Sequence, residues 1–192
     1  MKLKQIKVPG PEHPISIERN PARSVVSVAR RVIAETRNAL TLREAAYGWA
    51  DTPGLWSAEQ IRGWRGVTDA VHKKGGLIYA QRWHTGAMSH PDFFNGALPM
   101  SASNVNPQQE SVTPSGRKPT VAPRPMTRDE IRQTVADFGT AARNAMEAGF
   151  DGVQIQANYL YLIAQFLNSA TNRRKDEYGG STVNRPLPPR NH

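Results

Sequence analysis

The chain has 192 residues, of which 38% are hydrophobic and 21% charged, and it contains no cysteine. This composition is typical of one globular domain, and the lack of cysteine excludes a disulfide framework, a thiolate nucleophile and a cysteine-ligated metal. The formal net charge of +9 would suit a phosphate-rich partner. Because the basic residues are scattered and carry no nucleic-acid motif, we favour solvated faces over specific nucleic-acid binding.

Membrane and metal sites are not indicated by the sequence. No apolar run is long enough to span a bilayer, and the basic start lacks the apolar core of a signal peptide, so we expect a cytoplasmic protein. The five histidines fall in no recognised ligand spacing, so no metal is predicted. We interpret His84 and His90 as capping or solvated residues.

The amino-terminal part gives weak signals. Residues 1–29 carry prolines and charge with little periodicity, and we expect an irregular basic arm there. The valine-rich run 25–28 and the run 32–35 could form a strand, although Arg30 and Arg31 interrupt it.

A first helix and strand are well marked. Ser57 and Gln60 predict a capping box, and Gly75 predicts the left-handed end of the helix. A strand is predicted at residues 77–80. The apolar residues expected on the buried face of the helix are Ile61, Trp64, Val67 and Val71.

A second helix and strand repeat the same order. Thr127 and Glu130 predict another capping box, Gly149 ends the helix, and residues 150–156 are expected to form a strand. The proline-rich segment 91–125 between the two units is predicted to be a long loop. A further helix is expected at residues 160–167, before a polar loop at 171–181. The expected apolar stripe of the second helix is Ile131, Val135, Phe138, Ala142 and Met146.

The order helix, glycine, strand and polar cluster occurs twice in the chain. This repeat predicts an α/β protein with parallel strands joined by right-handed crossovers. Ligands gather at the carboxyl ends of such strands, where Gln81, Trp83 and His84 are expected. An amide that both donates and accepts, beside a flat indole, suits a planar heterocycle. The alternative is that these polar groups only cap the backbone at a strand end.

Many unlike motifs over about residues 30–185 occur in the order found in the old yellow enzyme family, which the chain resembles. The main matching segments are Thr52–Ser57, Gln81–Gly86, Ser89–Pro91, Gly96–Pro99, Glu147–Gly152, Gln165–Leu167 and Thr171–Ser181. The resemblance implies a flavoprotein oxidoreductase that uses FMN with NAD(P)H as reductant and reduces activated alkenes, as the N-ethylmaleimide reductases do. It also implies a partial (β/α)8 TIM barrel, holding roughly the second to fourth β/α units, and an irregular tail at 186–192.

The resemblance also implies cofactor-binding residues. Gln81 occupies the place of the glutamine that hydrogen-bonds the pyrimidine edge of the flavin. Thr36 stands where a small residue touches the flavin, and Gln156 lies at the end of the next predicted strand, where both flavin and substrate are expected.

For catalysis, Tyr161 occupies the place of the tyrosine that gives a proton to the substrate carbon opposite the incoming hydride. Gln156 and Tyr159 replace the family's paired substrate-binding residues, a histidine followed three positions later by asparagine or histidine. Gln156 can donate a hydrogen bond to a carbonyl oxygen but cannot become cationic, so enone polarisation should weaken. Trp83 is expected to line the substrate site, and Ala87 replaces the family's usual arginine.

Family barrels start with a strand and a loop over the flavin, and end with phosphate-binding loops that we do not find in the sequence. We therefore expect a truncated form, incomplete on its own, that binds FMN weakly or not at all. Its open barrel edges favour self-association. The alternative is a non-catalytic fragment, or a basic module that binds nonspecifically.

Overall fold

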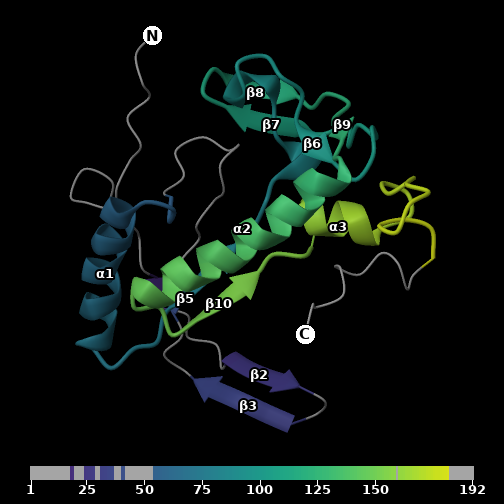
Figure 1. The fold of residues 1–192 in the computed structure, drawn as a ribbon. Coiled ribbons are helices and arrows are strands. Elements are labelled where there is room, and N and C mark those ends of the chain that lie inside the picture. Colours follow the sequence, from purple (N-terminus) through teal and green to yellow (C-terminus); the bar gives the residue numbers. More distant parts are fainter. Residues whose placement is uncertain are drawn as a thin grey trace. The chain divides into compact units, whose positions relative to one another are not determined.

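The computed structural model describes residues 18–19, 24–28, 31–36, 40–41, 54–158 and 160–181 (Figure 1). They form two compact units. The first holds residues 54–82 and 138–154 with the short strands before them, and the second holds residues 83–137, 155–158 and 160–181. In chain order the elements are β1 (Glu18–Arg19), β2 (Ser24–Val28), β3 (Arg31–Thr36), β4 (Leu40–Thr41), α1 (Ala58–His72), β5 (Tyr79–Arg82), the 3-10 helices η1 (Gly86–Met88) and η2 (Pro91–Phe93), β6 (Met100–Ser101), β7 (Glu110–Thr113), β8 (Gly116–Pro119), β9 (Arg124–Pro125), α2 (Arg128–Glu147), β10 (Gly152–Ile155) and α3 (Leu162–Leu167).

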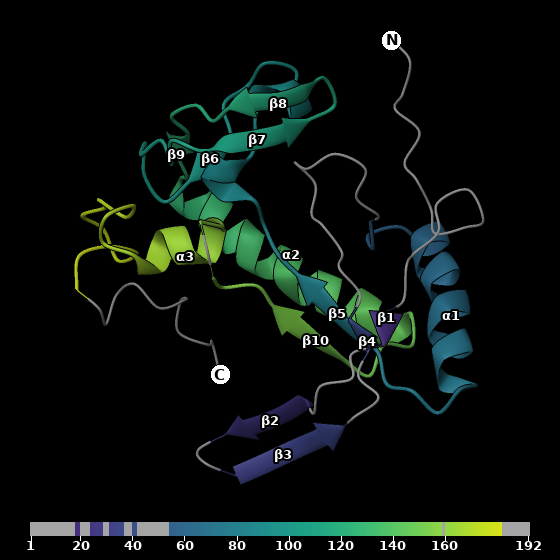
Figure 2. The same ribbon diagram turned by 180° about the vertical axis from the view of Figure 1, so that it is seen from behind.

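The described strands pair two by two. β1 with β4, β2 with β3, and β7 with β8 are antiparallel, β6 with β9 is parallel, and β5 pairs with β10. The arrows of β5 and β10 point the same way in Figure 2, as expected for two strands that each follow a helix. Both views show α2 running alongside β10.

The strand predicted at 77–80 lies two residues further along the chain, because pairing with β10 determines where it starts. The Asp151 amide donates to the Ile78 carbonyl at 2.9 Å, and the ladder with β10 starts after this bond. Gln81 therefore lies within β5, and not beyond its end as predicted, while Trp83 follows the strand directly.

The predicted ends of α1 are confirmed. The Ser57 hydroxyl accepts from the Gln60 amide at 3.2 Å, and the Gln60 side chain accepts from the Ser57 amide at 3.1 Å. These bonds satisfy two backbone donors that the first turn leaves without helical partners. At the other end Gly75 adopts a φ of +70°, the left-handed conformation that favours glycine.

α2 begins and ends as predicted, but only part of its predicted apolar stripe is buried: Ile131 is 5% exposed, whereas Val135 is 37% exposed. The capping box at Thr127 and Glu130 is present, with bonds of 3.2 and 2.8 Å. Met146 of the expected stripe is 53% exposed, whereas Ala145 and Ala148 are fully buried. The small alanines allow close approach: the Thr68 hydroxyl of α1 donates to the Ala148 carbonyl at 2.7 Å.

The core of the first unit lies between the two helices and β5. The rings of Trp64 and Phe150 lie 5.5 Å apart, and the Trp64 indole donates to the Gly54 carbonyl at 3.0 Å. The buried residues of this cluster are Leu55, Ile61, Trp64, Val71, Ile78, Ala80, Ala145, Ala148 and Phe150. Three of the four residues predicted on the apolar face of α1 are therefore in the core, and Val67 packs against it.

The valine-rich segment near the amino terminus differs from the sequence-based prediction. The valine run and the run after it form a hairpin of two antiparallel strands, β2 and β3, and not one strand. Arg31 is the first residue of β3 and pairs with Val28, while Arg30 lies outside the described residues. β1 and β2 thus lie within residues 1–29, for which we expected an irregular arm. The other residues of that arm and the tail 186–192 lie outside the described residues.

The predicted long loop at 91–125 contains a second hairpin. Thr113 of β7 pairs with Gly116 of β8, so Pro114 and Ser115 form a tight connection. Gly116 has a φ of +107°, and the Thr113 hydroxyl donates to the Gly116 carbonyl at 2.8 Å. Proline and glycine here mark one turn between strands, as they commonly do in hairpins.

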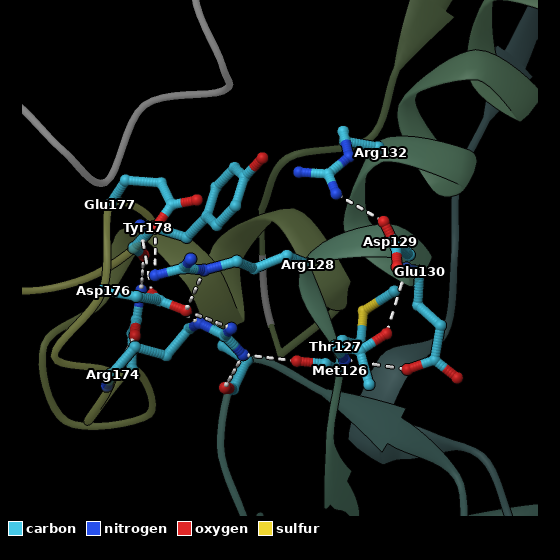
Figure 3. A network of polar contacts seen from close by, with 12 residues as sticks. Met126, Thr127, Arg128, Asp129, Glu130, Arg132, Arg174, Asp176, Glu177 and Tyr178 are labelled. Carbon is cyan, nitrogen blue, oxygen red and sulfur yellow. Dashed lines mark hydrogen bonds and ion pairs between the residues drawn. The ribbon is translucent and has the colours of Figure 1, made fainter.

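The polar loop 171–181 is held by one arginine of the second unit (Figure 3). The Arg174 guanidinium, only 10% exposed, binds both carboxylate oxygens of Asp176, at 2.9 and 2.5 Å, and donates to the Met126 carbonyl at 2.6 Å. The hydrogen bonds from Arg174 hold the pKa of Asp176 below its usual range. The planar guanidinium can donate two parallel hydrogen bonds to the two oxygens of a carboxylate, which the ammonium group of lysine cannot do.

We expect Arg174→Lys to lower the free energy of unfolding by about 2 kcal/mol, because lysine keeps the charge but loses the bidentate geometry and the bond to Met126. Urea unfolding at neutral pH measures this change. The control is Arg132→Lys, whose exposed ion pair with Asp129 should contribute less than about 0.5 kcal/mol. Equal shifts of the two urea midpoints would contradict the role given to Arg174.

Candidate active site

Two aromatic rings are in contact in the second unit. Trp83 follows β5, and Tyr161 is the residue that precedes the first turn of α3. Their centroids lie 4.2 Å apart with an interplanar angle of 85°, an edge-to-face contact in which one ring edge meets the other ring's face. The Leu162 amide donates to the His84 carbonyl at 2.9 Å and joins the same two segments through the backbone.

His84 is held as a neutral side chain. Its Nδ1 accepts a hydrogen bond from the Gly86 amide at 3.0 Å, which requires this nitrogen to be unprotonated. Burial lowers the pKa of His84 to about 4, and the charge of Asp137 opposes this shift only in part. The interpretation of His84 as a capping residue is therefore confirmed. His90 caps as well, since its ring accepts from the Asp92 amide at 3.2 Å.

Gly86 must be glycine in this arrangement. Its φ is +57°, and a Cβ there would overlap the buried amide of Gln165. The next residue, Ala87, is 2% exposed, and its amide donates to Gln165 Oε1 at 3.1 Å. The glycine of one sequence motif and the glutamine of another are thus in direct contact across 79 positions of the chain.

Gln81 lies in the first unit and is half-buried. Its Nε2 donates to Gln154 Oε1 of β10 at 2.6 Å, so the two amides lie on one face of the β5–β10 pair. An orientated amide of this kind matches a pyrimidine edge, where carbonyl acceptors flank an N–H donor. The chemistry of these residues therefore fits the flavin that the resemblance implies.

The structure places the other predicted site residues less fully. Gln156 directly follows β10 and is half-buried, and Thr36 is the last residue of β3, where only the backbone is described. Tyr159 lies outside the described residues. Sequence reasoning missed Gln154, although parallel pairing of the two predicted strands would have set it beside Gln81.

Within residues 54–158 and 160–181 no cluster of three or more acidic or histidine side chains is arranged to hold a metal ion. None of the helices in the described part of the chain is long and apolar enough to cross a membrane.

We expect the stability of the protein to fall between pH 6.5 and about 4 because of His84. Its folded pKa lies below the ordinary value of 6.5, so the unfolded chain binds more protons in this window. His84→Asn can keep an acceptor for the Gly86 amide without titrating, and should remove about 2 kcal/mol of this pH dependence.

Urea midpoints measured from pH 7.5 to 4.5 test this expectation, with the two proteins compared first at pH 7.5, where His84 is neutral in both states. The same slope in wild type and variant would show that His84 does not titrate as described.

Comparisons with known proteins show which family the chain resembles. Residues 21–187 match the profile of the NADH:flavin oxidoreductase / NADH oxidase family. The chain is 43% identical over 159 residues to 12-oxophytodienoate reductase 1 of Oryza sativa subsp. japonica. This match covers 78% of this chain and 40% of the relative. It is 45% identical over 143 residues to the flavin oxidoreductase hxnT of Emericella nidulans, covering 74% of this chain and 36% of the relative.

Solved structures show the same similarity. The old yellow enzyme homologue from Zymomonas mobilis matches with a TM-score of 0.68 and 44% identity, and morphinone reductase with a TM-score of 0.68 and 41% identity. Each match covers 72% of this chain and 39% of the solved chain. The chain thus spans about two fifths of the length of these relatives.

Both solved relatives are TIM-barrel enzymes of the old yellow enzyme type, which confirms the predicted fold class, an α/β chain that matches part of a (β/α)8 barrel. The chain belongs to the NADH:flavin oxidoreductase / NADH oxidase family, whose cofactor is FMN and whose reductant is NAD(P)H.

Proposed function

We propose that this chain contributes the proton donor and part of the flavin site to an FMN-dependent NAD(P)H oxidoreductase that reduces activated alkenes. The observation that carries the proposal is the phenol of Tyr161 held edge to face against Trp83 at the start of α3. Family membership supports the reaction type. The partners are accordingly small molecules: NADH or NADPH and an alkene conjugated to an electron-withdrawing group.

In this proposal Gln81, Thr36 and Gln156 contact the flavin. The Gln81 amide is orientated by its 2.6 Å hydrogen bond to Gln154. Its remaining donor and acceptor can therefore bind the pyrimidine edge without a further loss of side-chain conformational entropy. When bound, FMN supplies the hydride that reduces the alkene.

Tyr161 gives the proton that the other alkene carbon requires. A phenol with an ordinary pKa near 10 remains protonated at neutral pH and can donate without a change of charge before the reaction. The edge-to-face contact with Trp83 favours one orientation of the phenol ring. Its position directly before α3 ties its backbone to a regular element.

Gln156, Tyr159 and Trp83 are proposed to bind the substrate. Gln156 can donate one neutral hydrogen bond to the oxygen of the activating group, where a cationic donor would give a stronger, charge-assisted bond. We therefore expect the chain to favour alkenes that are already strongly polarised, such as those with two carbonyl groups or a nitro group, over simple enones.

Tyr161→Phe should separate the two halves of the reaction. In flavin-loaded protein, bleaching of the flavin by NAD(P)H should proceed as in the wild type, since it needs no phenolic proton. Reoxidation by an alkene should slow about a hundredfold or more, as is typical on loss of a general acid. Stopped-flow absorbance measures both rates.

The matched control for this change is Tyr178→Phe, which removes a phenol from the second core of the protein, where Tyr178 packs with Met126, Ile131 and Leu162. It should leave both rates close to those of the wild type. Equal slowing of both half-reactions by Tyr161→Phe would instead indicate that the ring only packs the site.

Gln156→His tests the substrate site. An imidazole that can carry a proton should polarise a simple enone better, and we expect about a tenfold higher reoxidation rate with an enone and little change with a nitroalkene. Asn158→His places the same side chain two residues along on an exposed position and is the control. A gain with Asn158→His and none with Gln156→His would move the substrate contact to Asn158.

A further inference from the structure

The side chain of Gln165 is 2% exposed and uses its whole hydrogen-bonding capacity. We infer that Gln165 is a positioning residue for Tyr161. Its side chain fixes the peptide group between Leu160 and Tyr161 and links this peptide group to the loop that follows Trp83. The inference rests on the proposed function only in taking Tyr161 as the proton donor. The geometry itself involves protein atoms alone.

The two ends of the Gln165 amide have different partners. Oε1 accepts from the Ala87 amide at 3.1 Å and from the Ser101 hydroxyl at 2.7 Å. Nε2 donates to the carbonyls of Leu160 and, at 3.4 Å, Thr85. The reverse orientation would set an NH2 group against the Ala87 amide and an oxygen against two carbonyls. Only one orientation of the amide therefore satisfies all partners.

The bond to Leu160 is the important one for chemistry. The Leu160 carbonyl belongs to the planar peptide unit whose nitrogen is that of Tyr161, so a fixed carbonyl direction fixes the plane from which the Tyr161 Cα departs. Backbone freedom at this point would swing the phenol by far more than the movement of the carbonyl itself. Gln165 thus limits the position of the ring through the backbone.

The partners at Thr85 and Ala87 lie on either side of Gly86, in the loop that follows Trp83. The same amide therefore holds the Leu160–Tyr161 peptide and this loop together, and the edge-to-face contact of Tyr161 with Trp83 joins the same two segments. Gly86 permits this arrangement because it has no Cβ in the space that the amide fills.

The test uses Gln165→Glu in the full chain without flavin. Glutamate has nearly the same shape, but its ionised oxygens repel the carbonyls of Leu160 and Thr85. The readout is the NMR signal of the Tyr161 ring in protein labelled with 13C-tyrosine, assigned by its loss in Tyr161→Phe. The indole of Trp83 shifts this signal from the value of free tyrosine because the two rings are in contact.

The control is Asn172→Asp, which makes the same chemical change at another buried amide. Asn172 is 5% exposed, and its Nδ2 donates to the carbonyls of Phe166 and Tyr178 at 2.8 and 2.7 Å. Both variants place a carboxylate against two carbonyls, so both should lose stability. Only Gln165→Glu should move the Tyr161 signal toward the free value while the other tyrosine signals keep their folded shifts.

An unchanged Tyr161 signal in folded Gln165→Glu, or an equal movement in Asn172→Asp, would overturn the inference. If Gln165→Glu does not fold, the uncharged and shorter Gln165→Asn gives the same test, with the same expected movement and the same contrary result. Failure of the proposed function is distinguishable, because a Tyr161→Phe protein that reoxidises normally would leave the NMR result as it is.

Discussion

The contact between Gly86 and the Gln165 amide is the constraint on which the second unit depends. A buried amide is costly unless every donor and acceptor is satisfied, and here the partners come from the loop after β5, from β6 and from the turn before α3. Trp83 and His84 come directly before Gly86 in the chain, and Tyr161 comes shortly before Gln165. The positions of the aromatic pair are therefore set by a polar contact beneath them.

Several residues that carry the family resemblance have structural roles rather than chemical ones. Arg174, Asp176 and Asn172 close the loop 171–181 by hydrogen bonds to backbone and to each other. At Gly179 a Cβ would overlap the Arg174 backbone. Because such residues specify the fold, they show the family securely. The chemistry rests on fewer positions, and the departures at Gln156 and Ala87 are the ones that bear on it.

Several arginines of the second unit form ion pairs within the protein. Arg174 is paired with Asp176, and Arg128 binds Glu177 at 2.9 Å. Arg124 binds Glu130 at 2.6 Å, and this bond, together with the capping contact to Thr127, lowers the pKa of Glu130 to about 2. Because each pair is electrically neutral, these arginines do not account for the excess positive charge, and the scattered, solvated character of that charge stays a prediction from the sequence.

Local patterns determined much of this protein. The capping boxes at Ser57 and Thr127 and the glycine at Gly75 fix helix ends through hydrogen bonds and backbone angles among neighbouring residues, so the sequence alone was sufficient to place them. The motifs that contain Tyr161 and Gln81 indicated the family, and the comparisons then showed that the chain belongs to it.

Only tertiary structure decided the rest. β5 starts where β10 can pair with it. Ala145 and Ala148 are buried because they belong to the core cluster that α2 shares with α1. The hairpin within 91–125 depends on the pairing of two strands that each have little signal in the sequence. The meeting of Gly86 with Gln165 likewise joins residues that are far apart in the chain, and no local pattern encodes which distant partner will fill the space that a glycine leaves.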